Sequence, residues 1–365
     1  MKALILNSGL GHRMGTLTSE YPKCMARISD KDTILSRQLK LIATSGITEI
    51  IMTTGYLDEV LTNYCNSLDL PLHYTFVKNS IYDKSNYIYS IYCAMVYLKD
   101  TDIILMHGDL VFEGSVIDSV CASEKSCMVV SSEAPLVEKD FKAVIKDGRI
   151  KQISTGFFNG AIAAEPLYKI KRSDWDVWLK KIFEFCENKK FECYAEDAFN
   201  EVSDRCEING LDIKNSLCME IDTPEDLAVA SSKVRDIENR TVYMCFSTDI
   251  IHNGHIAIIN KAQKLGKLFI GVLSDEAIAS YKRFPIIPFE DRKALFESIA
   301  GVFKVVRQDT LSYADILREL HPTYVVHGDD WREGFQKPIR DEVVSVLAEY
   351  GGQLVEYPYS KDAKY

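Results

Sequence analysis

Short apolar runs alternate with stretches of helical periodicity over about the first 230 residues of the chain. The apolar runs predict strands at Ala3–Leu6, Glu49–Thr53, Leu72–Val77, Ile103–Met106 and Cys127–Ser131. Between them, apolar positions spaced three and four residues apart predict helices at Ile34–Thr44, Leu57–Leu68 and Tyr87–Leu98. This alternation is typical of a doubly wound α/β domain with a mostly parallel sheet.

The alternation is interrupted by a charged stretch at Ser232–Arg240 and then restarts. We place a boundary there, which predicts one domain over residues 1–237 and another over residues 238–365. The second domain is again α/β, with strands predicted near 241–246, 268–273, 303–306 and 324–327. At 365 residues the chain is long enough for two such domains. Asp147-Gly148 predicts a β-hairpin over Val144–Ile153.

Composition limits the classes of partner. Hydrophobic residues make up 47% of the chain and charged residues 26%, as in a soluble protein with apolar cores. The net charge of −10 argues against a nucleic-acid partner or an anionic membrane surface. No apolar run approaches the roughly 20 residues that span a bilayer. The apolar start lacks a signal-peptide cleavage site and continues into a glycine loop, so we expect a strand there and a cytoplasmic protein with no membrane partner.

The ten cysteines are scattered, and no C-x-x-C pair occurs among them. The spacing of Cys121 and Cys127 suits no common zinc module. We therefore expect reduced thiols that pack as small hydrophobic side chains.

A glycine loop follows the first predicted strand, where Leu6–Met14 reads LNSGLGHRM. Gly9 and Gly11 allow the backbone to turn sharply and bring its N–H groups close to phosphate oxygens. Arg13 adds a fixed guanidinium and Lys23, after Pro22, a mobile cation, and both suit a triphosphate. The spacing matches neither the P-loop nor the dinucleotide-binding fingerprint.

Further segments occur in the order of one family. They are Gly55-Tyr56, Asn86-Tyr87-Ile88-Tyr89-Ser90, His107-Gly108-Asp109 and Glu220-Ile221-Asp222-Thr223-Pro224-Glu225-Asp226-Leu227. With the glycine loop and the later Leu17-Thr18 and Pro22-Lys23 pairs, they resemble the nucleotidyltransferase superfamily, and within it the phosphocholine and phosphonate cytidylyltransferase branch. The resemblance covers residues 1 to about 230 and implies an enzyme that uses CTP.

The implied reaction is attack of an anionic acceptor oxygen on the α-phosphate of CTP, with pyrophosphate leaving. Because two anions meet, Mg²⁺ and cationic side chains such as Arg13 and Lys23 must neutralise charge. The resemblance assigns Lys23 to the α-phosphate. Asp109 and Asp222 each follow a short strand, where ligands of open sheets bind, and we predict that they hold the Mg²⁺. Asp222 could instead cap the helix that begins at Thr223-Pro224.

The base and ribose contacts implied by the family fall on two segments. They assign nucleotide binding to Ser8, Gly9, Leu10, Gly11, Asn86 and Ser90. Asn and Ser side chains can hydrogen-bond the edge of a pyrimidine, whereas a purine pocket needs more room. Asn86 could equally cap the helix that follows it.

The acceptor pocket is expected between the sheet and residues 156–200. Gly156-Phe157-Phe158-Asn159-Gly160 is typical of a substrate-lining strand edge. Tyr194, Glu196 and Asp197 combine an aromatic ring with acidic groups, which suits an amine or ammonium head; a solvated helix face is the alternative. Such a patch favours 2-aminoethylphosphonate or phosphocholine over a neutral sugar phosphate. Acidic groups near a primary amine favour the phosphonate, and a carboxylate-free aromatic cage favours choline.

The predicted second domain carries its own motif, TDIIHNGH at Thr248–His255. His252, Gly254 and His255 resemble the H-x-G-H signature of a different cytidylyltransferase superfamily, in which the two imidazoles bind nucleotide phosphates and stabilise the transition state. Lys282-Arg283, Phe289-Glu290-Asp291-Arg292-Lys293 and Val326-His327-Gly328-Asp329-Asp330-Trp331 extend the likeness over residues 241 to about 360. It implies a Rossmann-like fold.

The second domain is similar to the cytidylyltransferase-like domain attached to phosphoenolpyruvate mutases, which implies a fusion or partnership with such a mutase and a phosphonate acceptor. A late R-x-x-G-I-S-[ST]-[ST] segment of that superfamily is replaced here by Tyr357-Pro358-Tyr359-Ser360-Lys361-Asp362. Either this domain has lost catalysis and binds nucleotide without turnover, or the chain is cut from a longer polypeptide. The sequence leaves both alternatives open.

Overall fold

The computed structural model describes residues 1–156 and 159–358. It divides the chain into two compact units, Met1–Val234 and Arg235–Tyr365. The division falls within one helix, α7 (Pro224–Asn239), which includes most of the charged stretch predicted to separate the domains. The boundary predicted between residues 237 and 238 lies in the same helix and stays a prediction.

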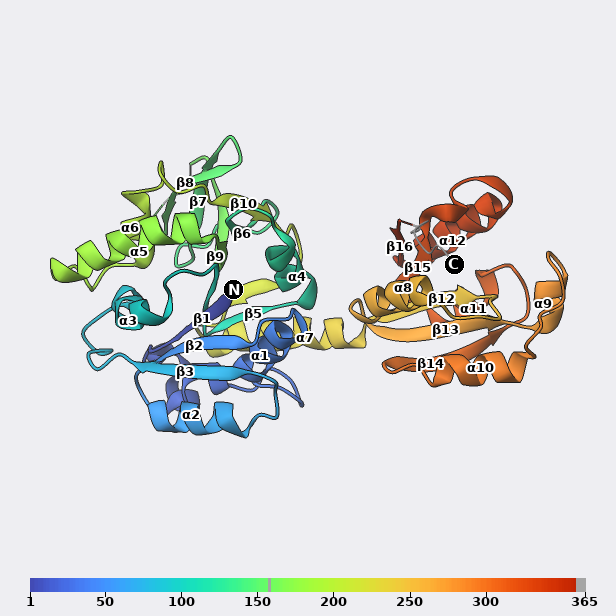
Figure 1. Cartoon of the computed structure of the whole chain (residues 1–365), viewed down its shortest axis with the longest axis horizontal. Coiled ribbons are helices and arrows are strands. Elements are labelled where there is room, and N and C mark those ends of the chain that lie inside the picture. Colours follow the sequence, from blue (N-terminus) through green and yellow to red (C-terminus); the bar gives the residue numbers. More distant parts are fainter. Residues whose placement is uncertain (157–158, 359–365) are drawn as a thin grey trace. The chain divides into compact units, whose positions relative to one another are not determined.

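Within the described residues, the first unit is built on a nine-stranded sheet of order β3-β2-β1-β4-β9-β6-β10-β8-β7 (Figure 1). Its strands are β1 (Lys2–Asn7), β2 (Glu49–Thr54), β3 (His73–Lys78), β4 (Ile103–His107), β6 (Cys127–Ser131), β7 (Lys142–Lys146), β8 (Arg149–Ser154), β9 (Ala161–Ile170) and β10 (Asn209–Asp212). A separate antiparallel pair is formed by β5 (Leu110–Phe112) and β11 (Cys218–Glu220). Strand β5 follows β4 directly in the chain, whereas β11 follows β10.

The direction of the strands changes across this sheet. The neighbours β3, β2, β1 and β4 are parallel, as the sequence predicts. Beyond β4, strand β9 runs antiparallel to both β4 and β6, and β7 and β8 form an antiparallel hairpin. At the hairpin turn, Asp147 and Gly148 both have positive φ, as a type I′ turn requires. The predicted doubly wound fold is confirmed, and its second half is a mixed sheet.

Helices cover both faces of the sheet because successive strand residues point to opposite sides. Leu4 and Leu6 pack with α3 (Tyr87–Ala94), α5 (Arg172–Glu187) and α6 (Ala195–Asn200). Ala3 and Ile5 pack with α1 (Ile34–Thr44), α2 (Asp58–Ser67) and α4 (Gly114–Ala122). Three short 3₁₀ helices, at His12–Thr18, Lys23–Met25 and Met95–Tyr97, complete the described elements of this unit.

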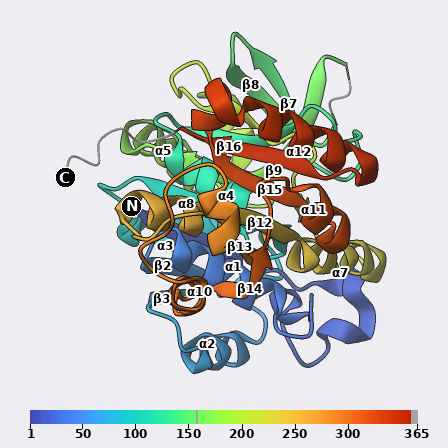
Figure 2. The same ribbon diagram turned by 90° about the vertical axis from the view of Figure 1, so that its right-hand side faces the viewer.

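The second unit has a five-stranded, all-parallel sheet of order β14-β13-β12-β15-β16 in the described part of the chain (Figure 2). The strands are β12 (Thr241–Phe246), β13 (Lys267–Leu273), β14 (Val302–Gln308), β15 (Tyr324–Gly328) and β16 (Gln353–Tyr357). The helices α8 (Asn253–Gln263) and α10 (Phe289–Glu297) share one core cluster, whereas α11 (Ala314–Leu320) and α12 (Lys337–Tyr350) share another. A short helix, α9 (Asp275–Ala279), follows β13. The predicted Rossmann-like α/β class is confirmed.

The ten cysteines are free thiols in this structure. Six of them are buried, namely Cys24, Cys65, Cys127, Cys186, Cys206 and Cys218, and the other four are partly exposed. Across residues 1–156 and 159–358, no helix combines the length and the apolar character that crossing a bilayer requires.

Candidate active site

The glycine loop leaves the end of β1 and forms one wall of a cavity of about 440 Å³. Gly11 has φ of 67°, and a Cβ there would lie 3.1 Å from the Cβ of Lys23, so the turn requires glycine. The predicted nucleotide-binding residues that line the cavity are Ser8, Gly9, Leu10, Gly11 and Asn86, together with the predicted catalytic residues Arg13 and Lys23. The loop therefore brings backbone and cations to one hollow at the carboxyl end of β1.

Lys23 joins the two predicted metal ligands. Its Nζ lies 3.1 Å from Asp222 Oδ1 and forms a closer ion pair with Asp109. Burial opposes the charge of Lys23, but the two carboxylates outweigh burial and raise the pKa of Lys23. For Asp109, burial opposes ionisation, yet the charges of Lys23 and His107 prevail and lower its pKa. Lys23 and Asp109 are thus both held in their charged forms.

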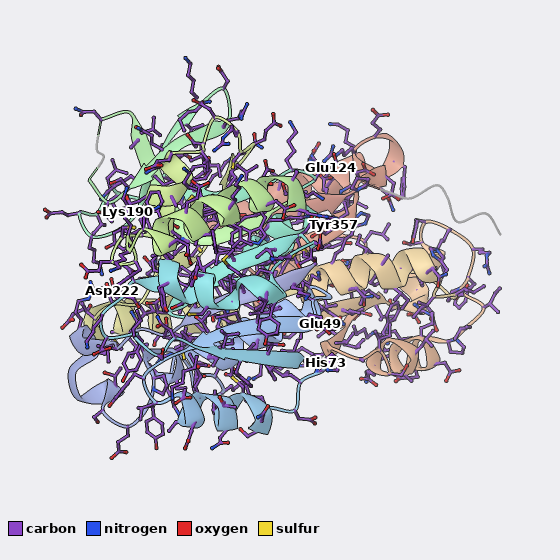
Figure 3. All side chains as sticks on the ribbon, turned by 60° about the vertical axis from the view of Figure 1, so that its left-hand side comes forward. Glu49, His73, Glu124, Lys190, Asp222 and Tyr357 are labelled. Atoms are coloured by element: carbon purple, nitrogen blue, oxygen red, sulfur yellow. The ribbon has the colours of Figure 1, made fainter. Side chains whose placement is uncertain are left out.

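Asp222 is available to the cavity because its neighbours cap α7. The hydroxyl of Thr223 accepts a hydrogen bond from the N–H of Asp226 at 3.1 Å, and the Asp226 carboxylate accepts from the N–H groups of Asp222 and Thr223. The carboxylate of Asp222, labelled in Figure 3, instead accepts a hydrogen bond from Arg13 at 2.9 Å. Of the two alternatives that the sequence leaves open, this structure shows the uncapped one.

The donor groups around Asp109 fit a divalent cation. Asp109 Oδ1 is buried and has no hydrogen-bond partner among the described residues. Ligand atoms of His107, Asp109 and Glu220 all lie within 4.8 Å of one another. Carboxylate oxygens suit Mg²⁺, whereas an imidazole nitrogen is more common around transition metals. The assignment of Asp109 and Asp222 as Mg²⁺ ligands stays a prediction.

Ser8 and Ser90 are joined by a hydrogen bond of 2.6 Å between their hydroxyl groups. Ser90 is fully buried, also accepts a hydrogen bond from Asn79, and is absent from the described cavity lining. Asn86 accepts a hydrogen bond from the N–H of Tyr87 at the start of α3 and lines the cavity as well. The structure therefore gives Asn86 the capping role and a place in the cavity together, and it places Ser90 behind Ser8.

The predicted acceptor residues separate into two groups. Tyr194 lines the cavity, with its ring 5.2 Å from the ring of Phe141 and 5.8 Å from that of Tyr87. Glu196 is 1% exposed and accepts hydrogen bonds from the hydroxyl groups of Tyr87 and Tyr168. Asp197 accepts a hydrogen bond from the N–H of Tyr194 and so caps α6.

Neither Glu196 nor Asp197 is among the described residues that line the cavity. Their hydrogen bonds are satisfied inside the protein, and this geometry does not favour the acceptor-binding role predicted for them. The predicted strand edge at residues 156–160 includes Phe157 and Phe158, which lie outside the described residues.

Another acidic residue, Glu220, does line the cavity. Glu220, at the end of β11, lies 2.8 Å from Nδ1 of His107, the last residue of β4. Burial outweighs the imidazole and raises the pKa of Glu220. Burial also works against the charged form of His107, but the hydrogen bond and charge of Glu220 raise the pKa of His107 above its ordinary value. His107 and Glu220 therefore form a hydrogen-bonded pair that lines the cavity.

The second unit has a cavity of about 390 Å³ at the start of α8. His252, Gly254 and His255 all line it. The rings of His252 and His255 stack with centroids 3.8 Å apart, and His252 Nδ1 accepts a hydrogen bond from the N–H of Gly254. Burial and the adjacent His252 lower the pKa of His255 to about 4. Of the late segment that begins at Tyr357, the residues from 359 onward lie outside the described part.

Two family models match the chain, one in each unit. Residues 3–141 match the MobA-like NTP transferase domain. Residues 245–352 match the family described as cytidylyltransferase-like. Each unit therefore contains a segment similar to a nucleotidyltransferase family, and the two families differ. The resemblance and the enzyme class predicted from the sequence are confirmed at this level, and the predicted link to a phosphoenolpyruvate mutase stays a prediction.

Two relatives of this chain are named for reactions of small phosphorus compounds. CTP:phosphoglutamine cytidylyltransferase of Campylobacter jejuni is 32% identical over 164 residues, which are 43% of this chain and 63% of that protein. CMP-5'-(3-aminopropyl)phosphonate synthase of Streptomyces rubellomurinus is 26% identical over 181 residues, which are 47% of this chain and 28% of that protein. Each match spans less than two thirds of the relative's length.

A solved structure is similar in fold to part of this chain. CTP:phosphocholine cytidylyltransferase of Streptococcus pneumoniae aligns with a TM-score of 0.53 and 17% identity, over 64% of this chain and 98% of that chain. This likeness supports the nucleotidyltransferase-like architecture predicted from the sequence.

Glu220 and His107 were not predicted as site residues from the sequence. Both lie in segments that carry the family resemblance, but only Asp109 and Asp222 were singled out there. The signal was the strand period: Glu220 is two residues before Asp222, and residues at that spacing share one side of an extended chain. His107 and Glu220 are 113 positions apart in the sequence, so their pairing could not be predicted from it.

Proposed function

We propose that the first unit transfers CMP from CTP to a small phosphonate, with 2-aminoethylphosphonate as the leading acceptor. An oxygen of the phosphonate attacks the α-phosphorus of CTP, the bond between that phosphorus and the oxygen bridging to the β-phosphate breaks, and pyrophosphate leaves. The observation that carries the proposal is the cavity in which Arg13, Lys23, Asp109 and Asp222 meet the glycine loop.

Different groups of the cavity would neutralise different parts of the phosphate charge. The glycine loop offers backbone N–H groups and Arg13 a guanidinium to the triphosphate. Lys23 is placed to neutralise the charge that develops at the α-phosphate. Asp109 and Asp222 both contact Lys23, so a divalent cation held by these carboxylates would lie near it. Such a cation would neutralise further phosphate charge.

The names of the relatives support CTP and a small acceptor. One relative is a cytidylyltransferase for phosphoglutamine and another makes a CMP-aminopropylphosphonate. Each name describes an acceptor that carries a nitrogen group as well as a phosphorus group. This favours an amine-bearing phosphonate or phosphate as the acceptor here.

The test is pyrophosphate release by the full chain with CTP and Mg²⁺, offering 2-aminoethylphosphonate and phosphocholine in parallel. Release with the phosphonate and the appearance of its CMP adduct are expected. Release with phosphocholine alone would support the second candidate, a phosphocholine cytidylyltransferase, which is favoured by the rings of Tyr87, Phe141 and Tyr194 around the cavity. Absence of release with both acceptors contradicts the proposed function.

For the second unit we propose CTP or CMP binding at His252, Gly254 and His255 without independent turnover. The cavity next to these residues and the family match over residues 245–352 support nucleotide binding. The measurement is calorimetric titration of the full chain with CTP, in which wild type is expected to show two binding sites. Replacing both histidines with Ala should remove one of them.

A further inference from the structure

Among the described residues that line the first cavity, Glu220 differs from the other carboxylates in its partner. Asp109 and Asp222 are both bound by Lys23, and Asp222 also by Arg13. The recorded partner of Glu220 is the imidazole of His107. Among the described carboxylates that line the cavity, Glu220 is therefore the one whose ion-pair partner is not a lysine or an arginine.

Aromatic rings surround this carboxylate. The ring of Tyr87 packs edge-on against His107, with centroids 4.6 Å apart. Tyr194 lies next to Tyr87, and Phe141 next to Tyr194, and all of them line the same cavity. An ammonium group is attracted both by a carboxylate and by the faces of aromatic rings. The combination suits an amine rather than a neutral sugar.

We propose that Glu220, hydrogen-bonded to His107, is the residue that selects the acceptor by binding its primary ammonium group, in a pocket walled by Tyr87, Phe141 and Tyr194. This inference rests on the proposed function of the first unit and names the acceptor class of that same site. Glu220, and not the predicted Glu196, supplies the negative charge, because Glu196 is buried and already accepts hydrogen bonds from two tyrosine hydroxyls.

The position of Glu220 limits the length of the acceptor. Its carboxylate lies within 4.8 Å of the nearest ligand atoms of Asp109 and His107. The reacting phosphorus must lie near Lys23 and Asp109, so the ammonium group and the phosphorus are close together. Bond lengths place the nitrogen of an extended two-carbon aminophosphonate about 4 Å from phosphorus, and one more carbon adds about 1 Å. An acceptor with a two- or three-carbon linker fits this spacing, whereas a long chain does not.

A primary ammonium fits better than a trimethylammonium group. Its N–H groups donate charge-assisted hydrogen bonds to a carboxylate, which a methylated nitrogen cannot do. The neighbouring Glu165 is not among the described residues that line the cavity. Apart from Asp109 and Asp222, which Lys23 contacts, the described carboxylate that lines the cavity is Glu220.

The test compares two acceptors of nearly equal shape, 2-aminoethylphosphonate and propylphosphonate, which lacks the charge. In steady-state kinetics of the full chain, wild type should prefer the amine. Glu220→Gln keeps the size of the side chain and should raise KM for the amine by about tenfold to a hundredfold, the scale of one charged hydrogen bond. The kcat/KM for propylphosphonate should change less than about threefold. Glu207→Gln, an exposed carboxylate outside the cavity, is the matched control.

Two outcomes would overturn the inference without touching the proposed function. One is a wild type that uses both phosphonates equally well; the other is a Glu220→Gln enzyme that loses activity with both by the same factor, as a structural or metal-binding role predicts. Calorimetric titration with each phosphonate in the presence of CMP tests binding without turnover. If wild type does not bind the amine more tightly than propylphosphonate, the inference fails even where no pyrophosphate is released.

Discussion

Lys23 lies between two carboxylates that would repel each other without it. Its contacts with Asp109 and Asp222 keep two acidic side chains side by side at the ends of β4 and β11. A cation that enters this site has the same electrostatic role, so Lys23 is positioned both to order the apo site and to stabilise charge during the reaction.

We expect Asp109→Ala to abolish pyrophosphate release and to leave the fold intact. The variant removes a proposed metal ligand, whereas Lys23 retains its ion pair with Asp222. Pyrophosphate release and the thermal unfolding curve should be measured together. Normal turnover in a folded Asp109→Ala enzyme would remove Asp109 from the mechanism.

Lys23→Ala is expected to lower kcat by about 10² to 10³, the scale measured elsewhere for loss of one preorganised donor. The exposed Lys31, for which no ion pair is recorded in the described residues, gives a matched Lys31→Ala control that should retain its rate. Steady-state kinetics at saturating CTP separate this effect from weaker binding. An unchanged kcat in Lys23→Ala contradicts the assigned role.

His255 gives the second unit a pH dependence with a defined sign. Its pKa is about 4 in the folded chain, against an ordinary value of 6.5. Between these values the unfolded chain binds a proton that the folded chain does not, so the free energy of unfolding decreases as pH falls from about 6.5 to about 4. Thermal unfolding at pH 7 and pH 5 should show a smaller loss of Tm in His255→Gln than in wild type; equal losses would contradict this.

At the scale of elements, the candidate site depends on how closely β1 approaches the end of β4. A Cβ on Gly108 would lie 1.6 Å from Asn7 Oδ1, so the Asn7 side chain can hold this position only if residue 108 is a glycine. Gly108 directly follows β4 and precedes Asp109, and the same contact therefore sets the position of a proposed metal ligand.

Gly108→Ala is expected to destabilise the first unit by about 1–3 kcal/mol, as in other overpacked sites, and to reduce turnover. Gly114→Ala is the matched control, because its Cβ would meet only Leu41 at 3.5 Å, an ordinary contact at the start of α4. Urea denaturation of both variants gives the comparison. Equal stability of the two variants would show that Asn7 moves aside without cost.

At the scale of the whole molecule, each unit has a cavity lined by residues that the sequence predicts to bind nucleotide. Replacing both His252 and His255 with Ala should leave pyrophosphate release by the first unit within about twofold, because these histidines belong to the other unit. A parallel loss of the first reaction would show that the two units act as one enzyme.

Much of this organisation could be predicted because it depends on local sequence. The strand and helix periods, the type I′ turn at Asp147-Gly148 and the glycine loop at Gly9–Gly11 are each set by residues close together in the chain. The structure places helix α1 at the predicted Ile34–Thr44. Strand β16 was missed, since it is a short edge strand that is defined by its pairing with β15.

The composition of the proposed acceptor site was decided only by the tertiary structure. The sequence placed acidic residues next to Tyr194, but it could not show that Glu196 would be buried between two tyrosine hydroxyls. It also could not pair His107 with Glu220, which come from different strands. A motif determines which groups are available along the chain, whereas burial and long-range hydrogen bonds determine which of them face the ligand.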